Sequence, residues 1–538
     1  MDTREYIKIV SDRAIRNMQK AGVLACAELP VFQVLKPAIK DRGDYAISVA
    51  MELAKLEKKN PMELAELLKE EISSEKDFRK YFSKIETAAP GFINFYLSPE
   101  YLYNIVKQVL SEKEKFGNLD LGKNKKVQVE FVSANPTGPL TVGNGRGGPF
   151  GDVLANVLKK AGYKTEKAYY VNDYGQQVLA LGHSVLKDEE AKYSGEYIDE
   201  LNKQLVPRIK DPYQLGREAA KIILETIIKK TIEKLNIKYD EWFSEALLQE
   251  SGEVDKTIDL LKKKNFVYEK DGAQWFKATK FGDERDRVLI KSDGAKTYLA
   301  GDIAYHKYKF EKKKFDKAIN VWGADHFGDV VGLKAGVEAF GYKNKLDIVL
   351  LQFVTVMKDG KPVKMSKRLG TAITMDDLLE ELPADVVRFF FLQKSANTHL
   401  NFDMDLAKEQ SDKNPVFYVQ YAHARIASIL ERVEPHFVKT SRGKFQMDLL
   451  SKPVELSLIK QIARLPEIVE DTAKDNQVHR LTQYAIDLAT SFHQFYGECH
   501  VLIDDEKLKQ ARLGLVLATK IVLKNTLDLL GVSAPEKM

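Results

Sequence analysis

Residues 127 to 177, VQVEFVSANPTGPLTVGNGRGGPFGDVLANVLKKAGYKTEKAYYVNDYGQQ, read as a strand, a glycine-rich turn, a helix and a second strand in one unbroken unit. Over the first strand apolar residues alternate with polar ones, as in a half-buried strand, at Val127, Val129 and Phe131. The helix is expected from about Pro149 to Ala161. A strand that leads through such a turn into a helix is typical of a nucleotide-binding site.

Five glycines crowd the start of this helix, at positions 143, 145, 147, 148 and 151. Because glycine has no side chain, a phosphate or a ribose can approach backbone N–H groups there, at the positive end of the helix dipole. We therefore expect the turn to hold the phosphate or ribose part of a nucleotide.

A second segment, VTVMKDGKPVKMSKRLGTAITMDDLL from Val354 to Leu379, has the composition of a basic loop. Lys364, Lys367 and Arg368 cluster in it, and Gly370 is a candidate hinge. Closing over a triphosphate, such a loop would neutralise charge as the bond between the α and β phosphates breaks. Taken alone, two lysines around a serine are usually a solvated surface loop; together with the glycine-rich unit they favour one ATP site.

The composition is that of an ordinary soluble protein with several domains. The chain has 538 residues, 44% hydrophobic and 30% charged, and about 150 residues per domain suggests three or four domains. With 83 basic and 78 acidic residues, the net charge of +5 is too small to indicate nucleic-acid binding by itself. The two cysteines, Cys26 and Cys499, fit no metal-ligand spacing, so we expect a reducing cytoplasm and no structural metal. Without a signal peptide or a long apolar run, we expect no membrane span.

The first part of the chain, residues 1–110, reads as a small α+β module. Amphipathic patterns predict helices at Glu5–Ala21 and Tyr45–Leu56, and a strand is predicted at Gly91–Leu97. The polar stretch Ser111–Lys126 contains two glycines and is a candidate linker.

The remaining residues divide into a mixed part and a helical part. In residues 111–375 strands alternate with helices, which favours a largely parallel sheet, and about 187–270 reads as a mostly helical insertion. Residues 376–413 form a connecting segment. In 414–538 apolar residues recur at three- and four-residue steps, which predicts a helical bundle.

Both motifs resemble those of class I aminoacyl-tRNA synthetases. Lys-Met-Ser-Lys-Arg at 364–368 is close to the KMSKS loop of that class, and Thr141-Val-Gly-Asn144 stands where the class has its HIGH motif. Other segments, spread over essentially the whole chain, are similar to arginyl-tRNA synthetases in particular: Glu130, Asn135, Tyr298–His306, Trp322–His326, Asn414–Arg425 and Gly531–Met538.

The resemblance implies an α/β fold, with a Rossmann-like catalytic domain between an N-terminal module that contacts tRNA and a C-terminal all-α bundle that binds the anticodon. It implies that L-arginine reacts with ATP to give arginyl-adenylate, only when tRNA(Arg) is bound, and that arginine passes to the 2′-OH of the terminal adenosine. The substrate carboxylate is the nucleophile, so the protein supplies positioning and charge stabilisation. Mg²⁺ is expected to arrive on the ATP. A cytoplasmic monomer is expected.

The chain departs from the family pattern at Thr141 and Asn144. The family usually has His-x-Gly-His there, and this chain has neither histidine. The Thr-Ile-Gly-Asn form of tryptophanyl enzymes is a close precedent. An asparagine amide still donates a hydrogen bond to a phosphate or ribose oxygen, although it brings no charge and no titratable proton. The departure therefore bears on the rate more than on the reaction.

Carried over residue by residue, the resemblance implies four sets of contacts. The arginine contacts are Glu130, Ser133, Asn135, Asn144, Tyr298, Asp302 and His326. The ATP contacts are Pro136, Thr137, Gly138, Gly143, Gly145, Asp325, Lys364, Met365 and Lys367. The residues that act on the reacting groups are Thr141, Gly143, Asn144, Lys364, Ser366 and Lys367. The tRNA contacts are Asn94, Tyr418, Tyr421 and Arg425.

The residue types leave structural alternatives open for several of these positions. Tyr298 and Asp302 are four residues apart, so on a helix both face the same way and suit a planar guanidinium, but Asp302 equally fits a helix cap and Tyr298 a core aromatic. Glu130 equally fits a structural hydrogen-bond acceptor. Phe417 and Tyr421 equally fit a buried aromatic stripe rather than a surface that stacks bases.

Two other functions stay open at this point. One is a class I synthetase for a different amino acid, which the pair Tyr298 and Asp302 disfavours because it suits a cation. The other is a tRNA-binding paralogue without catalysis, which Thr141 and Asn144 suggest but the complete loop at 364–368 disfavours.

Overall fold

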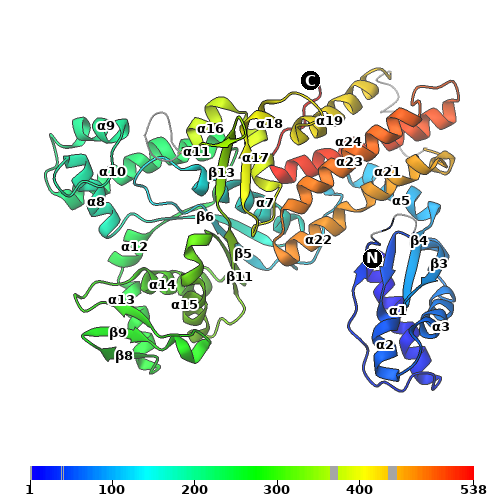
Figure 1. Cartoon of the computed structure of the whole chain (residues 1–538), viewed down its shortest axis with the longest axis horizontal. Helices are drawn as coiled ribbons and strands as arrows, with labels where there is room; N and C mark the ends of the chain where they lie inside the picture. Colours follow the sequence, from blue (N-terminus) through cyan, green and yellow to red (C-terminus); the bar gives the residue numbers. More distant parts are fainter. Residues whose placement is uncertain (1–2, 38, 40–41, 364–372, 434–444) are drawn as a thin grey trace. The chain divides into compact units, whose positions relative to one another are not determined.

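The computed structural model describes residues 3–37, 39, 42–363, 373–433 and 445–538 (Figure 1). The chain forms two compact units, which we describe separately. Unit 1 comprises Met1–Lys113, Leu430–Ala463 and Ser491–Ile521, and unit 2 comprises Glu114–Ile429, Arg464–Thr490 and Val522–Met538.

Unit 1 contains an antiparallel sheet in the order β1-β2-β4-β3. Its strands are β1 (Val34–Leu35), β2 (Tyr45–Ile47), β3 (Phe82–Ala88) and β4 (Phe92–Leu97). Helices pack with this sheet and with one another: α1 (Thr3–Lys20), α2 (Val49–Glu57), α3 (Pro61–Ser73), α4 (Phe78–Tyr81), α5 (Pro99–Glu112) and α21 (Pro453–Ala463).

The helix predicted over Tyr45–Leu56 is wrong in its first part. Tyr45, Ala46 and Ile47 form β2 and pair with β4, and all three side chains are buried. The sheet offers these consecutive apolar residues more burial than a single helix face would, so the helix begins only at Val49. The helix predicted at Glu5–Ala21 and the strand predicted at Gly91–Leu97 are confirmed as α1 and β4.

Unit 2 contains the predicted parallel sheet. The strand order is β12-β11-β5-β6-β7, and every neighbouring pair is parallel. The strands are β5 (Lys126–Phe131), β6 (Lys164–Val171), β7 (Glu241–Ser244), β11 (Lys317–Gly323) and β12 (Leu346–Leu351). The order reverses on either side of β5, and ligands of open α/β sheets bind beyond the carboxyl ends of the strands at such a point. The predicted α/β fold class is confirmed.

The range 187–270 is mostly helical, as expected, but it also contributes β7 to the sheet. Four residues were too few to show a strand period inside a charged, helical stretch. The helices around β7 are α8 (Gln176–Leu186), α9 (Glu196–Leu205), α10 (Pro212–Ile223), α11 (Lys229–Lys234), α12 (Glu245–Glu250) and α13 (Glu253–Lys263). A small antiparallel sheet follows, formed by β8 (Val267–Lys270), β9 (Ala273–Phe276) and β10 (Arg287–Ile290).

The rest of unit 2 begins with α14 (Tyr298–Glu311) and α15 (Phe327–Ala339), which pack against each other. A three-stranded sheet consists of β13 (Val354–Lys358), β14 (Lys361–Pro362) and β15 (Leu400–Asp403), and the helices beside it are α16 (Met375–Glu381), α17 (Ala384–Leu392) and α18 (Met404–Lys408). The predicted helical character after residue 414 is confirmed by α19 (Pro415–Glu431), α22 (Leu465–Asp475), α23 (His479–Glu498) and α24 (Glu506–Leu530). Of the helices described, none is long and apolar enough to span a bilayer.

The glycine-rich turn forms two helices, α6 (Val142–Gly145) and α7 (Gly147–Lys160). Close packing surrounds three of its glycines, most tightly Gly151 and Gly145. A Cβ at Gly151 would lie 2.1 Å from the Phe131 ring, one at Gly145 2.1 Å from the Met375 sulfur, and one at Gly148 2.9 Å from Ile237. Only glycine lets α7 approach β5 this closely. The expectation that all five glycines make room for a nucleotide is therefore too broad.

Arg388 on α17 joins three segments of unit 2 that are far apart in sequence. Its side chain is fully buried, and its guanidinium donates to the carbonyls of Leu530 (2.8 Å) and Leu235 (2.8 Å) and to the Asp152 carboxylate (2.5 Å). A Cβ at Gly531 would lie 2.0 Å from Arg388 Nη2, so only glycine fits beside it.

We predict that Arg388→Ala destabilises unit 2 by about 3 to 5 kcal/mol, because it leaves buried acceptors without a donor. Urea unfolding followed by tryptophan fluorescence measures this, since Trp242, Trp275 and Trp322, the only tryptophans in the chain, all lie in unit 2. Arg480→Ala is the matched control: its ion pair with Asp475 is partly exposed and should cost less than about 1 kcal/mol. Equal unfolding midpoints for the two variants would contradict the role of Arg388.

Candidate active site

A strained loop follows β5 and begins the site. Val132 and Ser133 have positive φ angles of 66° and 43°, which a β-branched residue such as valine rarely adopts. The loop is held by hydrogen bonds: the backbone N–H of Tyr170 donates to Ser133 Oγ (3.1 Å), and Asn172 Nδ2 donates to the Ser133 carbonyl (3.2 Å). These bonds fix the backbone just before Asn135, at the carboxyl edge of the sheet.

Tyr298 and Asp302 lie on α14, as expected. Tyr298 is the first residue of the helix and is 64% exposed, so it is no core aromatic. Asp302 is one turn further on, and Thr297 precedes the helix at the capping position, so Asp302 is no helix cap. The structure thus removes both structural alternatives for this pair.

Three carboxylates face one buried tyrosine at this edge of the sheet. The pKa of Tyr170 on β6 is raised well above its usual value because the ring is buried and lies near the carboxylates of Glu245, Asp302 and Glu130. Burial and the neighbouring Glu130 and Glu245 raise the pKa of Asp302 to about 8. The cluster therefore holds more negative charge than its surroundings stabilise.

Glu245 is a member of this cluster that the sequence did not reveal. It is 6% exposed, and burial raises its pKa to about 7. Its Oε2 atom has no hydrogen-bond partner among the described residues, and a Cβ built on Gly301, next to Asp302, would lie 3.6 Å from its Oε1. A buried acceptor without a donor calls for a specific explanation, and a bound cationic group would be one.

Asp173 places Glu245 in the site. Its carboxylate accepts hydrogen bonds from Ser244 Oγ (2.6 Å) and from the Ala246 N–H (2.8 Å), on either side of Glu245. The signal that would have revealed Glu245 is its place directly after a strand of the parallel sheet, but β7 was hidden in the helical pattern around it.

His326 and Asp325 lie beyond the end of β11, and both side chains are exposed. His326 Nδ1 is 3.5 Å from Asp329 Oδ2, and Asp329 is among the carboxylates that raise the pKa of Asp302. His326 is thus connected to the edge of the cluster through Asp329.

Thr141 and Asn144 form a hydrogen-bonded pair at the start of α6. Thr141 Oγ1 accepts from the Asn144 N–H (3.3 Å) and donates to Asn144 Oδ1 (2.7 Å). The carbonyl of the Asn144 amide is therefore engaged within the turn, and the side chain, which is exposed, presents its NH₂ group as a donor.

Backbone hydrogen bonds join this turn to residues that follow the Lys364–Arg368 motif in sequence. The Val142 N–H donates to the Ile373 carbonyl (3.0 Å), and the Met375 N–H donates to the Leu140 carbonyl (2.7 Å). The turn is therefore bonded to Ile373 and Met375, which follow the second expected ATP motif in sequence. Lys364, Met365, Ser366 and Lys367 themselves lie outside the described residues.

The other predicted ATP contacts lie along the loop between β5 and α6. Tyr197 Oη donates to the Thr137 carbonyl (2.9 Å). A Cβ at Gly138 would lie 2.9 Å from Tyr197 Oη, so Gly138 makes room for Tyr197. Pro136 is buried. The Gly145 N–H donates to the Thr141 carbonyl (2.9 Å), whereas Gly143 is exposed and a Cβ there would meet only Thr141 Oγ1, at 3.8 Å. Of the two helix glycines, Gly143 is the accessible one.

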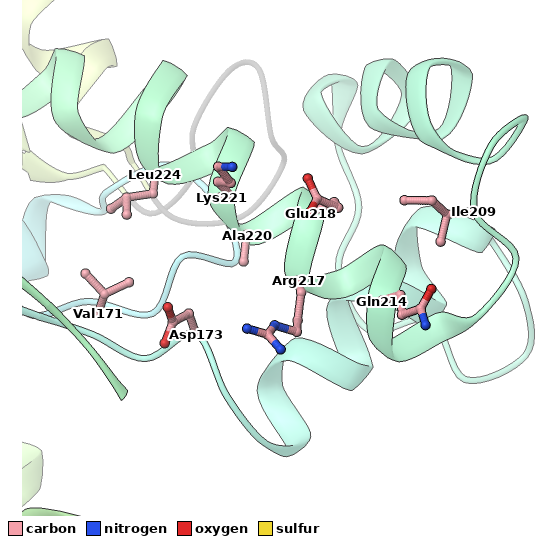
Figure 2. A pocket seen from close by; sticks show the side chains of 9 residues that line it. All are labelled: Val171, Asp173, Ile209, Gln214, Arg217, Glu218, Ala220, Lys221 and Leu224. Atoms are coloured by element: carbon pink, nitrogen blue, oxygen red, sulfur yellow. The ribbon is translucent and has the colours of Figure 1, made fainter. Parts of the chain in front are cut away.

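A cavity of about 510 Å³ lies beside the end of β6, between the loop that carries Asp173 and helix α10 (Figure 2). Charged side chains of α10 line it together with Asp173, which also holds the turn around Glu245. The lining residues are Val171, Asp173, Ile209, Gln214, Arg217, Glu218, Ala220, Lys221 and Leu224, and none of them is a predicted contact.

The predicted tRNA contacts lie in two places. On α19, Arg425 stacks over the Tyr421 ring, with the guanidinium carbon 4.6 Å from the ring centre, and Tyr418 Oη donates to Thr490 Oγ1 (3.3 Å). In unit 1, Asn94 on β4 is only 4% exposed. Tyr421, at 37% exposed, is the most accessible of the aromatic pair that it forms with Phe417.

No group of three or more His, Cys, Asp or Glu side chains that could hold a metal ion occurs in the part of the chain that the structure describes. The two sulfhydryl groups, of Cys26 and Cys499, are free.

Three protein-family models match the chain. "Arginyl tRNA synthetase N terminal domain" matches residues 10–97. "tRNA synthetases class I (R), catalytic domain" matches residues 105–203 and 183–389, and "DALR anticodon binding domain" matches residues 419–538.

Similar proteins cover almost the whole chain. The arginine–tRNA ligase of Caldanaerobacter subterraneus is 44% identical over 99% of both chains. A structure described as a putative arginyl-tRNA synthetase from Campylobacter jejuni is 33% identical, with a TM-score of 0.74, over 82% of this chain and 100% of that chain. The fold is also that of Thermus thermophilus arginyl-tRNA synthetase, with a TM-score of 0.81 at 24% identity over 100% of both chains. The chain therefore belongs to the arginyl-tRNA synthetase family of class I aminoacyl-tRNA synthetases.

Proposed function

We propose that this enzyme is an arginine–tRNA ligase in which the cluster of Glu130, Glu245 and Asp302 forms the side-chain pocket for arginine. The observation that carries the proposal is the gathering of carboxylates: Glu130 and Glu245 lie close enough to Asp302 to raise its pKa, and Glu245 Oε2 has no partner among the described residues. A guanidinium is always charged and presents a planar fork of donors that fits carboxylates. Arginine is the amino acid that such a pocket would select.

Tyr298, His326, Ser133 and Asn135 complete the proposed arginine site. The phenol of Tyr298 lies one helical turn before Asp302 and offers a ring face or a hydroxyl to the guanidinium. Ser133 and Asn135, in the strained loop, are proposed to face the α-amino end of the substrate, and His326 the outer edge of the site.

The reaction proposed for the site needs no nucleophile from the protein. The arginine carboxylate attacks the α-phosphorus of ATP, and arginine then passes from the adenylate to the 2′-OH of the terminal adenosine of tRNA(Arg). The Asn144 amide, oriented by Thr141, is proposed to donate to a phosphate or ribose oxygen, with Gly143 leaving room for it. Lys364, Ser366 and Lys367, with Met365, are proposed to cover the leaving pyrophosphate.

Several finer properties belong to the same proposal. Mg²⁺ would be held chiefly by the ATP phosphates, because magnesium commonly binds through substrate phosphates and keeps several waters. The remaining ATP contacts would be Pro136, Thr137, Gly138, Gly145 and Asp325. We also propose that adenylate forms only when tRNA is bound and that the enzyme acts as a cytoplasmic monomer.

The tRNA contacts are proposed along α19 and in the first module. Tyr421 and Arg425 present a ring and a guanidinium together, which suits stacking on an unpaired base near a phosphate. Tyr418 and Asn94 are proposed with them. The division into parts at 1–110, 111–375, 376–413 and 414–538 is proposed as a functional one.

We predict that Asp302→Ala lowers kcat/KM for arginine by about 10² to 10⁴ fold, or about 3 to 5 kcal/mol, because the guanidinium loses a buried charge partner. The measurement is charging of total tRNA with each labelled amino acid in turn. Wild type should charge arginine alone. Glu311→Gln, on the same helix outside the cluster, is the control and should keep activity. An Asp302→Ala enzyme with unchanged kcat/KM would refute the pocket.

The arginine KM should fall as the pH rises from about 6 to 8.5. In the free site Asp302 and Glu245 have pKa values of about 8 and 7, and they bind the guanidinium only when ionised. Below the pKa of each carboxyl, binding must therefore weaken by up to about tenfold for every pH unit. Steady-state kinetics across this range measures the slope. Glu245→Gln should lose the component near pH 7, and an arginine KM that is flat with pH would contradict the raised pKa values.

Asn144 separates a working enzyme from a tRNA-binding protein without catalysis. Asn144→Ala should cost about 2 to 4 kcal/mol of transition-state stabilisation, the usual effect of losing one such donor, whereas Asn144→His should stay active. Arginylation of cognate tRNA(Arg) with ATP and Mg²⁺ measures both. A wild-type enzyme that charges nothing in this assay would overturn the proposed function.

A further inference from the structure

A buried lysine lies directly behind the carboxylate cluster. Lys309 on α14 has no exposed surface, and its ammonium donates to Glu130 Oε2 (2.5 Å) and to Asn320 Oδ1 (3.3 Å). Its nitrogen also lies 4.4 Å from the centre of the Tyr305 ring. An ammonium has three donors, and these three neighbours account for all of them.

The hydrogen bonds that continue from Lys309 can run in one direction only. Because Lys309 donates to Asn320 Oδ1, Asn320 is left to donate through Nδ2, which lies 3.0 Å from His306 Nε2. His306 must then accept at Nε2 and donate from Nδ1, which lies 2.7 Å from the Asp302 carbonyl oxygen. A carbonyl accepts and never donates, so the order Lys309, Asn320, His306, Asp302 is fixed.

The fold brings these residues together from three elements. Asp302, His306 and Lys309 lie on one face of α14, at spacings of four and three residues. Asn320 on β11 pairs in register with Glu130 on β5. Lys309 thus connects two neighbouring strands with the helix that carries Tyr298 and Asp302.

Stability alone is a poor reason for this arrangement. His306 is 1% exposed, Asn320 has no exposed surface and Glu130 is 6% exposed, so every member of the network has lost its hydration. Buried ion pairs of this kind often contribute no more stability than apolar residues of similar size. What such a network does supply is fixed geometry, and the geometry fixed here is that of two proposed arginine contacts.

We infer that Lys309 is a positioning residue for arginine binding: it holds Glu130 in place by charge and fixes the turn of α14 at Asp302 through Asn320 and His306. This inference depends on the proposed arginine pocket. It separates the roles of the three carboxylates, since Glu130 is engaged by a cation of the protein while Glu245 and Asp302 are left for the cation of the substrate.

The charges around Lys309 make its effect measurable. Asp302 or its neighbours are faced by titratable groups from four other elements: Glu130 on β5, Tyr170 on β6, Glu245 on α12 and Asp329 on α15. On the same helix, Lys309 adjoins Tyr305 and His306. Tyr305 in turn lies near Glu166 and Glu241. Among the groups acting on Asp302, Lys309 lowers its pKa, whereas the carboxylates raise it. His306 stays neutral, because burial and Lys309 lower its pKa to about 3.

The test compares Lys309→Met, Lys309→Arg, Asn320→Ala and the control Lys307→Met. Lys307 is also buried on α14, but its ion pair is with Glu311 of the same helix, away from the network. Lys309→Met should raise the arginine KM at least tenfold with less than a threefold change in the ATP KM. The pH at which arginine binding is half-maximal should also move upward. Lys309→Arg should recover part of both effects, and Lys307→Met should match wild type.

Asn320→Ala keeps the ion pair of Lys309 with Glu130 but removes the hydrogen bonds of Asn320 with Lys309 and His306. It should therefore raise the arginine KM about three- to tenfold without moving the pH midpoint. If thermal melting shows that Lys309→Met does not fold, the arginine KM of Asn320→Ala tests the inference instead. The inference is overturned if the arginine KM is unchanged in both variants, if the ATP KM rises in the same proportion, or if the midpoint stays fixed in a folded Lys309→Met. The wild-type enzyme in the same assay tests the proposed function separately, because only its failure to charge tRNA with arginine would refute the proposed function.

Discussion

The rest of the proposed active site depends on one constraint, the buried negative charge at the carboxyl edge of the parallel sheet. Two like charges about 5 Å apart repel by about 3 kcal/mol at an effective dielectric constant of 20, so a cluster of carboxylates is costly without cations. The protein supplies one cation, Lys309, and leaves Asp302 and Glu245 partly protonated in the free site. In the proposed pocket, the guanidinium of the substrate would supply the charge that completes the cluster, and selection of arginine over neutral amino acids would follow from that deficit.

The nucleotide side of the site depends on close packing rather than on charge. Helix α7 lies so near β5 that Gly151 touches the Phe131 ring, and Gly145 makes room for Met375. Met375 begins α16, a few residues after the Lys364–Arg368 motif in sequence, and its N–H is bonded to the Leu140 carbonyl. The same contacts that seat the helix therefore hold Met375 beside the Thr141–Asn144 turn.

Local patterns in the sequence predicted the class of fold, and the family resemblance supplied most of the proposed site. The strand at 127–131, the helix near 149–161 and the spacing of Tyr298 and Asp302 each follow from a few neighbouring residues, and each is present as β5, α7 and α14. Glu245 was missed because β7 has only four residues and gains its strand form from pairing with β6. Tyr45–Ile47 was assigned to a helix for the same reason, since its partner, β4, lies about fifty residues further along the chain.

The Lys309 network shows a second limit of reading a sequence. Nothing local distinguishes Lys309 from the solvated lysines around it, such as Lys312 and Lys314, and only the fold buries it. Conversely, the glycines at 145, 148 and 151 are evident in the sequence, but their cause is tertiary packing that the sequence does not display. A pattern identifies a residue that matters more readily than it identifies the physical reason.

The contact of Arg388 with the last turn of α24 bears on how the protein folds during its synthesis. Unit 2 begins at Glu114, yet its buried arginine finds acceptors at Leu530, and Gly531 closes over the guanidinium. When Arg388 leaves the ribosome, more than a hundred residues that separate it from those partners have yet to be made. The packing around the Arg388 guanidinium is therefore complete only after synthesis has passed residue 531, although its other two acceptors, Asp152 and Leu235, are made before it.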